Sequence, residues 1–183
     1  MENQVPPLST TLQKGPVLLR PLHATDAPDL ARHINNKKIW DNLRDYIPFP
    51  YSEQDAQEFI ASVQPQNPTL TFGITYEQQI CGVIGLETQQ DVYKKSASFG
   101  YWVSEAYWGK GIASTALKLL TEYGLNQLGY IRLFTSVFAY NPGSMRVLEK
   151  NGYIKEGIFK KAIFKNNQIW DEHRYAIVRE DKN

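Results

Sequence analysis

Apolar and polar residues repeat with two different periods along the chain, and the changes of period divide it into strands and helices. Alternating or β-branched runs predict strands over residues 17–20, 69–76, 80–87, 96–103, 132–138, 153–164 and 168–178. Apolar residues spaced by three and four predict helices over 25–34, 52–63, 112–128 and 142–150. Strands and helices are mixed along the chain, which predicts an α+β domain.

Capping residues support several of these boundaries. Ser52 and Asp55 have the spacing of a capping box, with Asp in place of the usual Glu. Asn141 can cap the helix that Pro142 begins, since proline suits the first helical position. Gly129 follows the longest helical pattern and can close it in a left-handed conformation.

Length and composition predict one domain over residues 1–183, with residues 1–15 as a polar N-terminal tail. Hydrophobic residues make up 42% and charged residues 21% of the chain, which are ordinary globular values and exclude overall disorder. Twenty basic and nineteen acidic residues give a formal net charge of +1. Such a balanced charge argues against nucleic acid as the main partner.

The single cysteine, Cys81, excludes an intrachain disulfide and a cysteine metal cluster, so we expect no metal. Residues 1–15 lack the basic, apolar and small-residue order of a secretion signal. No apolar run approaches the ~18 residues that cross a bilayer. We therefore expect a cytoplasmic protein without a membrane partner.

A glycine-containing loop joins the strand at 96–103 to the long helix that follows. Gly109 and Gly111 stand where the first amides of a helix have no partner and the helix dipole is positive, and Lys110 adds a charge. These features predict a phosphorylated ligand. The spacing fits neither a Walker A loop nor a dinucleotide fingerprint. The alternative is a loop that only turns the chain.

The run Tyr107-Trp108-Gly109-Lys110-Gly111-Ile112-Ala113 resembles the pyrophosphate-binding loop of the GNAT N-acetyltransferase superfamily, in the form found in its RimJ/RimL branch. The segment from Asn141 to Tyr153 resembles a second signature of that family. The resemblance covers residues 17–178. It implies a mixed, mostly antiparallel sheet of about seven strands, with helices on both faces and a splayed fourth and fifth strand.

The resemblance also implies that acetyl-CoA binds between the splayed strands, with residues of three segments as its contacts. The backbone of Tyr101, Trp102 and Val103 would pair with the pantetheine arm, and Asn141 would contact that arm or the acceptor. The pyrophosphate would be held by Trp108, Gly109, Lys110, Gly111, Ile112, Ala113 and Ser114.

Two residues are the candidates for catalysis. Many family members use a Tyr in the second signature to protonate the CoA thiolate, but Leu148 stands there, which leaves Ser144 as the candidate. Ser144 could alternatively only help cap its helix. The acceptor amine must lose a proton, and Glu87, acting through ordered water, is the candidate base. Glu87 and nearby Asp91 could alternatively be solvated surface charges.

Three functions remain open from the sequence. The first is acetylation of a protein or peptide N-terminal amine, bound between residues 40–51 and the final hairpin. The second is acetylation of a small-molecule amine such as a polyamine, an amino acid or an antibiotic. The third is a non-catalytic acyl-CoA sensor. In each case we expect a monomer or homodimer.

Overall fold

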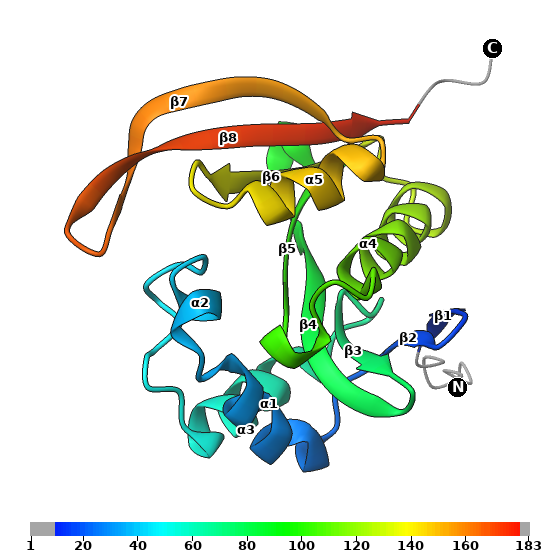
Figure 1. Cartoon of the computed structure of the whole chain (residues 1–183). Coiled ribbons are helices and arrows are strands. Elements are labelled where there is room, and N and C mark those ends of the chain that lie inside the picture. The colour runs from blue at the N-terminus through cyan, green and yellow to red at the C-terminus, as the bar shows by residue number, and fades with distance from the viewer. Residues whose placement is uncertain (1–9, 180–183) are drawn as a thin grey trace.

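An eight-stranded sheet organises residues 10–179, the part of the chain that the computed structural model describes (Figure 1). The strand order is β1-β2-β3-β4-β5-β6-β8-β7, and only β5 and β6 pair in parallel. The predicted mixed, mostly antiparallel sheet is therefore confirmed. The strands are β1 Leu12–Lys14, β2 Val17–Arg20, β3 Thr71–Tyr76, β4 Gln79–Thr88, β5 Ser96–Val103, β6 Arg132–Phe138, β7 Ile154–Lys165 and β8 Gln168–Val178.

The prediction that residues 1–15 are a polar tail is wrong for residues 12–14. These residues form β1, which pairs with β2 so that Leu12 lies opposite Leu19. Gly15 adopts a φ of +57° and turns the chain between the two strands. A three-residue strand with one apolar residue is too short to show alternation. Residues 1–9 of the predicted tail lie outside the described residues.

The four predicted helices are present, and a short fifth lies in the segment after the first. Their bounds are α1 Ala27–Ile34, α2 Lys37–Trp40, α3 Glu53–Val63, α4 Ile112–Glu122 and α5 Pro142–Lys150. A 3-10 turn at Ala24–Asp26 precedes α1, and a π-helical turn at Tyr123–Gln127 extends α4. The capping box of α3 and the cap of α5 form as predicted. Gly129, with a φ of +73°, follows the π turn.

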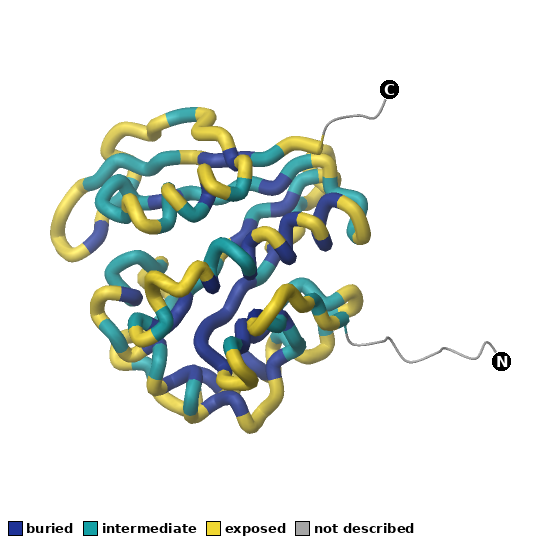
Figure 2. Tube along the Cα trace, turned by 45° about the vertical axis from the view of Figure 1, so that its right-hand side comes forward, coloured by how far each residue is buried: buried dark blue, intermediate teal, exposed yellow. Residues whose placement is uncertain are grey.

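Helices cover both faces of the sheet because side chains alternate across it. In β4, Ile84 and Leu86 belong to the core shared with α4 and α5, whereas Val83 belongs to the core shared with α1 and α3. The same alternation in β5 sends Phe99 to the first core and Trp102 to the second. Figure 2 shows the buried strands running between more exposed helices and loops. Packing of helices on both faces fixes the orientation of β5, and this orientation decides which of its residues face the functional site.

A partly buried ion pair links the end of β2 to the turn before α1. Arg20 donates two hydrogen bonds of 2.8 Å to Asp26, which also accepts from the His23 N–H at 2.8 Å. Burial by itself would raise the pKa of Asp26, but the bonds from Arg20 and His23 outweigh it, and the pKa lies below its usual value. The ionised carboxylate therefore stabilises the fold.

We expect Asp26→Asn to lower the free energy of unfolding at pH 7 by about 2 kcal/mol, because Arg20 would lose its charged partner. Since folding depresses the pKa of Asp26, the difference from the parent protein should be full above about pH 4 and shrink as the pH falls further. Urea titrations across pH 3–7 measure it. Asp29→Asn, which removes an exposed pair with Arg32, should change stability by less than about 0.5 kcal/mol.

None of the helices within residues 10–179 combines the length and the apolar character required to cross a membrane.

Candidate functional site

β5 and β6 diverge soon after they begin, as the resemblance to the GNAT superfamily implied. Their parallel pairing covers only Ser96–Ser98 and Arg132–Phe134. One further bond, from Thr135 Oγ1 to the carbonyl of Phe99 at 2.8 Å, continues the contact. Beyond it no strand among the described residues pairs with this edge of β5, which remains paired with β4 on its other side. A gap therefore opens in the middle of the sheet.

The backbone groups that face this gap follow from the alternation of β5. The Phe99 carbonyl points to β6, whereas the Ser104 N–H donates to Cys81 on the β4 side at 2.8 Å. Odd-numbered residues of β5 therefore direct their N–H and C=O groups into the gap. The carbonyl of Val103 accepts from the Trp108 indole at 2.7 Å. The N–H and C=O of Tyr101 and the N–H of Val103 thus remain without a strand partner.

The glycine loop brings the start of α4 to the same gap. Gly109 and Gly111 have φ values of +77° and +75°, which L side chains rarely adopt. The first helical hydrogen bond runs from the Thr115 N–H to the Gly111 carbonyl, and no side chain of the described residues caps the helix. The amides of Ile112, Ala113 and Ser114 therefore have no intrahelical acceptor, and a positive dipole end faces the gap.

The side chain of Lys110 does not lie at the pyrophosphate site that the family resemblance implied. Its ammonium group stands over the rings of Tyr76 and Tyr107, 5.5 and 5.2 Å from their centroids. These rings attract the cation through their negative faces. Lys110 does not line the cleft described below. In this structure the positive character of the loop comes from the amides of α4.

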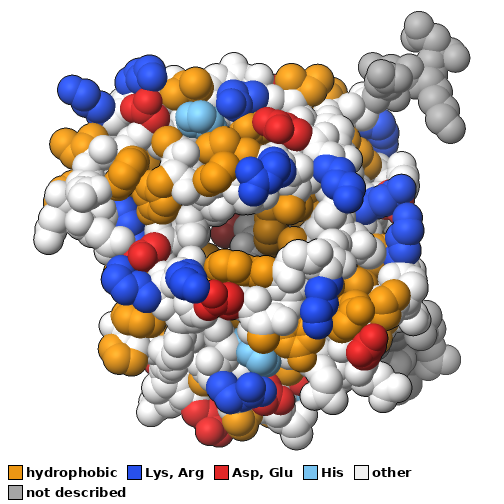
Figure 3. All heavy atoms as spheres, in the orientation of Figure 1, with side chains coloured by type: hydrophobic (Ala, Val, Ile, Leu, Met, Phe, Trp, Pro, Cys, Tyr) orange, Lys and Arg blue, Asp and Glu red, His pale blue; other side chains and the backbone are white. Residues whose placement is uncertain are grey.

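The gap is part of a cleft of about 1010 Å³, bounded by the splayed strands, the glycine loop, α5, residues 38–47 and the end of β7. Figure 3 shows a hollow near the centre of this face. Apart from Lys110, every site residue expected from the sequence lines this one cleft. These residues are Glu87, Tyr101, Trp102, Val103, Trp108, Gly109, Gly111, Ile112, Ala113, Ser114, Asn141 and Ser144.

Two hydroxyl groups meet across the cleft between β5 and α5. Tyr101 OH and Ser144 Oγ are 2.9 Å apart. Burial raises the pKa of the Tyr101 phenol, and the bond from Ser144 offsets only part of that effect, so the phenol keeps its proton at neutral pH. Asn141 caps α5 by accepting from the Ser144 N–H at 3.1 Å. Leu148 is fully buried in the core.

Charged groups line the cleft on both sides of the sheet. Arg146 and Lys150 lie one turn apart on α5. On the other side of the sheet, Glu87 accepts from Ser98 Oγ at 3.0 Å. Glu172 accepts from Ser136 and Arg174, both at 3.0 Å. The cleft therefore has cationic groups on α5 and carboxylates near β4 and β8.

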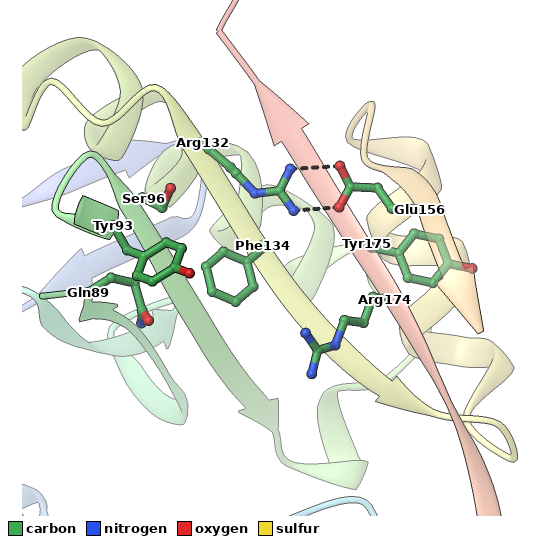
Figure 4. Close-up of a pocket in the computed structure, with 8 residues that line it drawn as sticks. All are labelled: Gln89, Tyr93, Ser96, Arg132, Phe134, Glu156, Arg174 and Tyr175. Carbon is green, nitrogen blue, oxygen red and sulfur yellow. Dashed lines mark hydrogen bonds and ion pairs between the residues drawn. The ribbon is translucent and has the colours of Figure 1, made fainter. Parts of the chain in front are cut away.

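A second, smaller hollow of about 180 Å³ lies on the sheet face beside β5, β6 and β8. Figure 4 shows Arg132 facing Glu156, with Phe134 and Tyr93 side by side. Arg132 binds Glu156 through both terminal guanidinium nitrogens, and Arg174 binds Glu172. Because both arginines already have carboxylate partners, this hollow is a weaker anion site than the start of α4. No group of three metal-binding side chains occurs within the described range.

Comparison with known proteins decides the family. The model of the acetyltransferase (GNAT) domain matches residues 17–154. The chain belongs to the GNAT acetyltransferase family. It is 33% identical to the ribosomal-protein-serine acetyltransferase of Escherichia coli over 78% of this chain and 81% of that protein. It is 26% identical to the spermidine N(1)-acetyltransferase of the same organism, over 89% and 86%.

Solved structures show the same GNAT fold. RimL, a ribosomal L7/L12 α-N-protein acetyltransferase in complex with coenzyme A, superposes with a TM-score of 0.82 over 92% of this chain and 98% of that one, at 21% identity. This confirms the GNAT fold that the sequence motifs implied. The family uses acetyl-CoA as the acetyl donor, and the chain is therefore an acetyltransferase.

The GNAT motifs did not reveal every side chain of the cleft. The sequence assigned Tyr101 a backbone role only, although its spacing from Phe99 and Val103 placed the three side chains on one face of the strand. The predicted strand over residues 153–164 stopped before Lys165, but Lys165 ends β7 and its side chain is 3% exposed. Only the tertiary contacts of Lys165, with residues 120 positions away, reveal its location.

Proposed function

We propose that this GNAT enzyme transfers the acetyl group of acetyl-CoA to an N-terminal amine of a protein or peptide. The observation that carries the proposal is the free edge of β5, which shares one cleft with the uncapped amides of α4. An extended amide-containing arm can pair with such an edge, and a diphosphate suits such a helix end. Acetyl-CoA has both parts, together with a reactive thioester.

The residues of the cleft fit this donor. The amides of Ile112, Ala113 and Ser114 would bind the diphosphate, and a Cβ at Gly109 or Gly111 would meet no protein atom within 4 Å. Arg146 and Lys150 on α5 add positive charge near this end. The C=O of Tyr101 and the N–H of Val103, which is closer to the glycine loop, would pair with the pantetheine arm. The Tyr101 N–H, which is farther from that loop, would stabilise the charge that develops on the thioester oxygen.

The hydroxyl pair of Tyr101 and Ser144 would donate a proton or hydrogen bond to the departing sulfur. A thiolate is a better leaving group when it is protonated or hydrogen-bonded as it departs, since the free thiol has a pKa of about 8.5. The raised pKa of Tyr101 favours its protonated, donating form.

Glu87 remains our candidate for removing the amine proton through ordered water. Its carboxylate lines the cleft and accepts a hydrogen bond from Ser98 Oγ at 3.0 Å. We expect Glu87→Gln to lower kcat/KM for the acceptor by about tenfold and to flatten the acidic limb of the pH–rate profile. Glu122→Gln, at the far end of α4, is the control. A Glu87→Gln profile that overlays the parent's removes Glu87 from the mechanism.

The part of the cleft lined by residues 42–47 and the end of β7, which we call the acceptor half, has charges that favour a single amine over a polyamine. Of the three carboxylates that line the cleft within the described residues, Asp45 pairs with Lys165 and Glu172 with Arg174. Only Glu87 has no cationic partner. Gly85 and Gly100 lie opposite each other on the floor, where the lack of side chains leaves room for a chain end. The likeness to the E. coli ribosomal-protein enzyme supports the same acceptor.

Thiol release from acetyl-CoA, measured with a panel of acceptors, tests the proposal. A peptide with a free N-terminal serine should be acetylated, and the same peptide with a blocked N-terminus should not. The similarity to a spermidine acetyltransferase makes spermidine the informative competitor. A kcat/KM for spermidine above that for every free-N-terminus peptide would replace our acceptor with a polyamine.

A further inference from the structure

The segment that follows α2 is tied to the tip of the β7–β8 hairpin, although about 120 residues separate them in sequence. Lys165 and Asn166 of the hairpin bond to residues 41–45, and we call this set of contacts the bridge. Asn166 donates to Asp41 Oδ1 at 2.8 Å, and the Tyr140 hydroxyl donates to the Asp41 carbonyl. Figure 1 shows the hairpin tip reaching toward α2.

Lys165 is the centre of the bridge. Its ammonium group donates to the Leu43 carbonyl at 3.0 Å and to Asp45 Oδ1 at 2.6 Å. It also lies 3.4 Å from the centroid of the Trp40 indole. The Lys165 side chain is only 3% exposed. A buried ammonium group is costly unless all of these partners stay in place, so Lys165 fixes the segment in one position.

The bridge borders the acceptor half of the cleft. On one side of it, residues 42–47 line the cleft, and on the other side residues 162–165 do. The glycine loop and the start of α4 line the opposite half. Movement of the bridge would therefore change the shape of the acceptor half and leave the acetyl-CoA half intact.

We propose that Lys165 is a positioning residue for the acceptor: by holding residues 41–47 against the β7–β8 hairpin, it forms the wall against which the amine-bearing chain end binds. The inference rests on the proposed function, since it assumes that the acceptor enters this half. It assigns Lys165 a role in acceptor affinity and none in the chemistry of the thioester.

Lys165→Met keeps most of the side-chain volume and removes the charge. We expect it to raise KM for the N-terminal serine peptide by about tenfold, with KM for acetyl-CoA changed by less than about twofold. Lys160→Met is the matched control, because Lys160 makes an exposed ion pair with Asp171 in the same hairpin and does not line the cleft. Equal effects of the two variants on acceptor KM would overturn the proposal.

A second measurement needs no acceptor. Arg44 is exposed within the tethered segment, so trypsin should cut after it faster once the segment is released. Lys165→Met should increase the rate of this cleavage, followed by mass spectrometry, by about tenfold, and Lys160→Met should leave it unchanged. An unchanged rate in Lys165→Met refutes the bridge itself.

Asp45→Asn is a second variant that tests the bridge if Lys165→Met does not fold. The Asp45 side chain is 65% exposed, so its replacement should not unfold the protein. It should raise KM for the peptide in the same direction as Lys165→Met, by a smaller factor. If cleavage rises but no peptide is acetylated, the proposed acceptor is wrong and the bridge stands. If peptides are acetylated with unchanged KM in both variants, the bridge has no role in acceptor binding.

Discussion

Gly111→Ala is expected to raise KM for acetyl-CoA by about 100-fold. A rise of this size corresponds to the loss of roughly two charge-assisted hydrogen bonds from amides to phosphate. The new methyl group would meet no protein atom, but it would extend from the loop where we place the diphosphate. The φ of +75° also strains any residue with a Cβ, which would shift the amides of Ile112 and Ala113. Initial rates against acetyl-CoA concentration measure the change.

Gly129→Ala separates the effect on the ligand from the effect on the backbone. Gly129 follows the other end of the same helix with a φ of +73°, and a Cβ there would also meet nothing within 4 Å. Both variants should therefore lose a similar amount of stability, about 1–2 kcal/mol. Only Gly111→Ala should weaken acetyl-CoA binding. Similar KM values in the two variants would mean that the start of α4 does not hold the diphosphate.

The sequence predicted the parts of the fold that depend on local patterns. The run from Ser96 to Val103 alternates because one of its faces packs in the core with α4, whereas Ser98 and Gly100 on the other face are not buried. The glycines of the loop and of Gly129 were informative because their left-handed φ values exclude most other residues. The divergence of β5 from β6 came from the family resemblance alone, since no local pattern encodes it.

The parts that the sequence did not predict depend on contacts between distant segments. Lys165 stands next to an Asn-Asn turn, and lysine is rarely buried, so nothing in its sequence neighbourhood indicates burial. Its burial depends on Trp40, Leu43 and Asp45, which lie in a segment without regular periodicity. The Tyr101–Ser144 pair likewise needs the register of β5 against α5, which only the folded chain defines.

Tyr101→Phe is expected to lower kcat by about 100-fold with little change in KM for acetyl-CoA. The variant keeps the ring that packs on the core, and it removes the hydroxyl that bonds to Ser144 Oγ at 2.9 Å. Because burial raises the pKa of Tyr101 above its ordinary value, the parent enzyme should keep this donor protonated at neutral pH, and loss of activity from its ionisation should appear at a higher pH than for a free phenol. Pre-steady-state thiol release across pH 6–10 measures both effects.

Tyr153→Phe is the matched control, because it removes a tyrosine hydroxyl that also bonds to a second hydroxyl, at a buried site outside the cleft. Tyr153 OH lies 2.8 Å from Thr121 Oγ1, so its loss should cost about 1 kcal/mol of stability, as for a single buried hydrogen bond. Its kcat should match that of the parent. If Tyr101→Phe and Tyr153→Phe reduce kcat equally, the effect comes from core packing. If only Ser144→Ala reduces kcat, the serine hydroxyl serves the departing sulfur without the phenol.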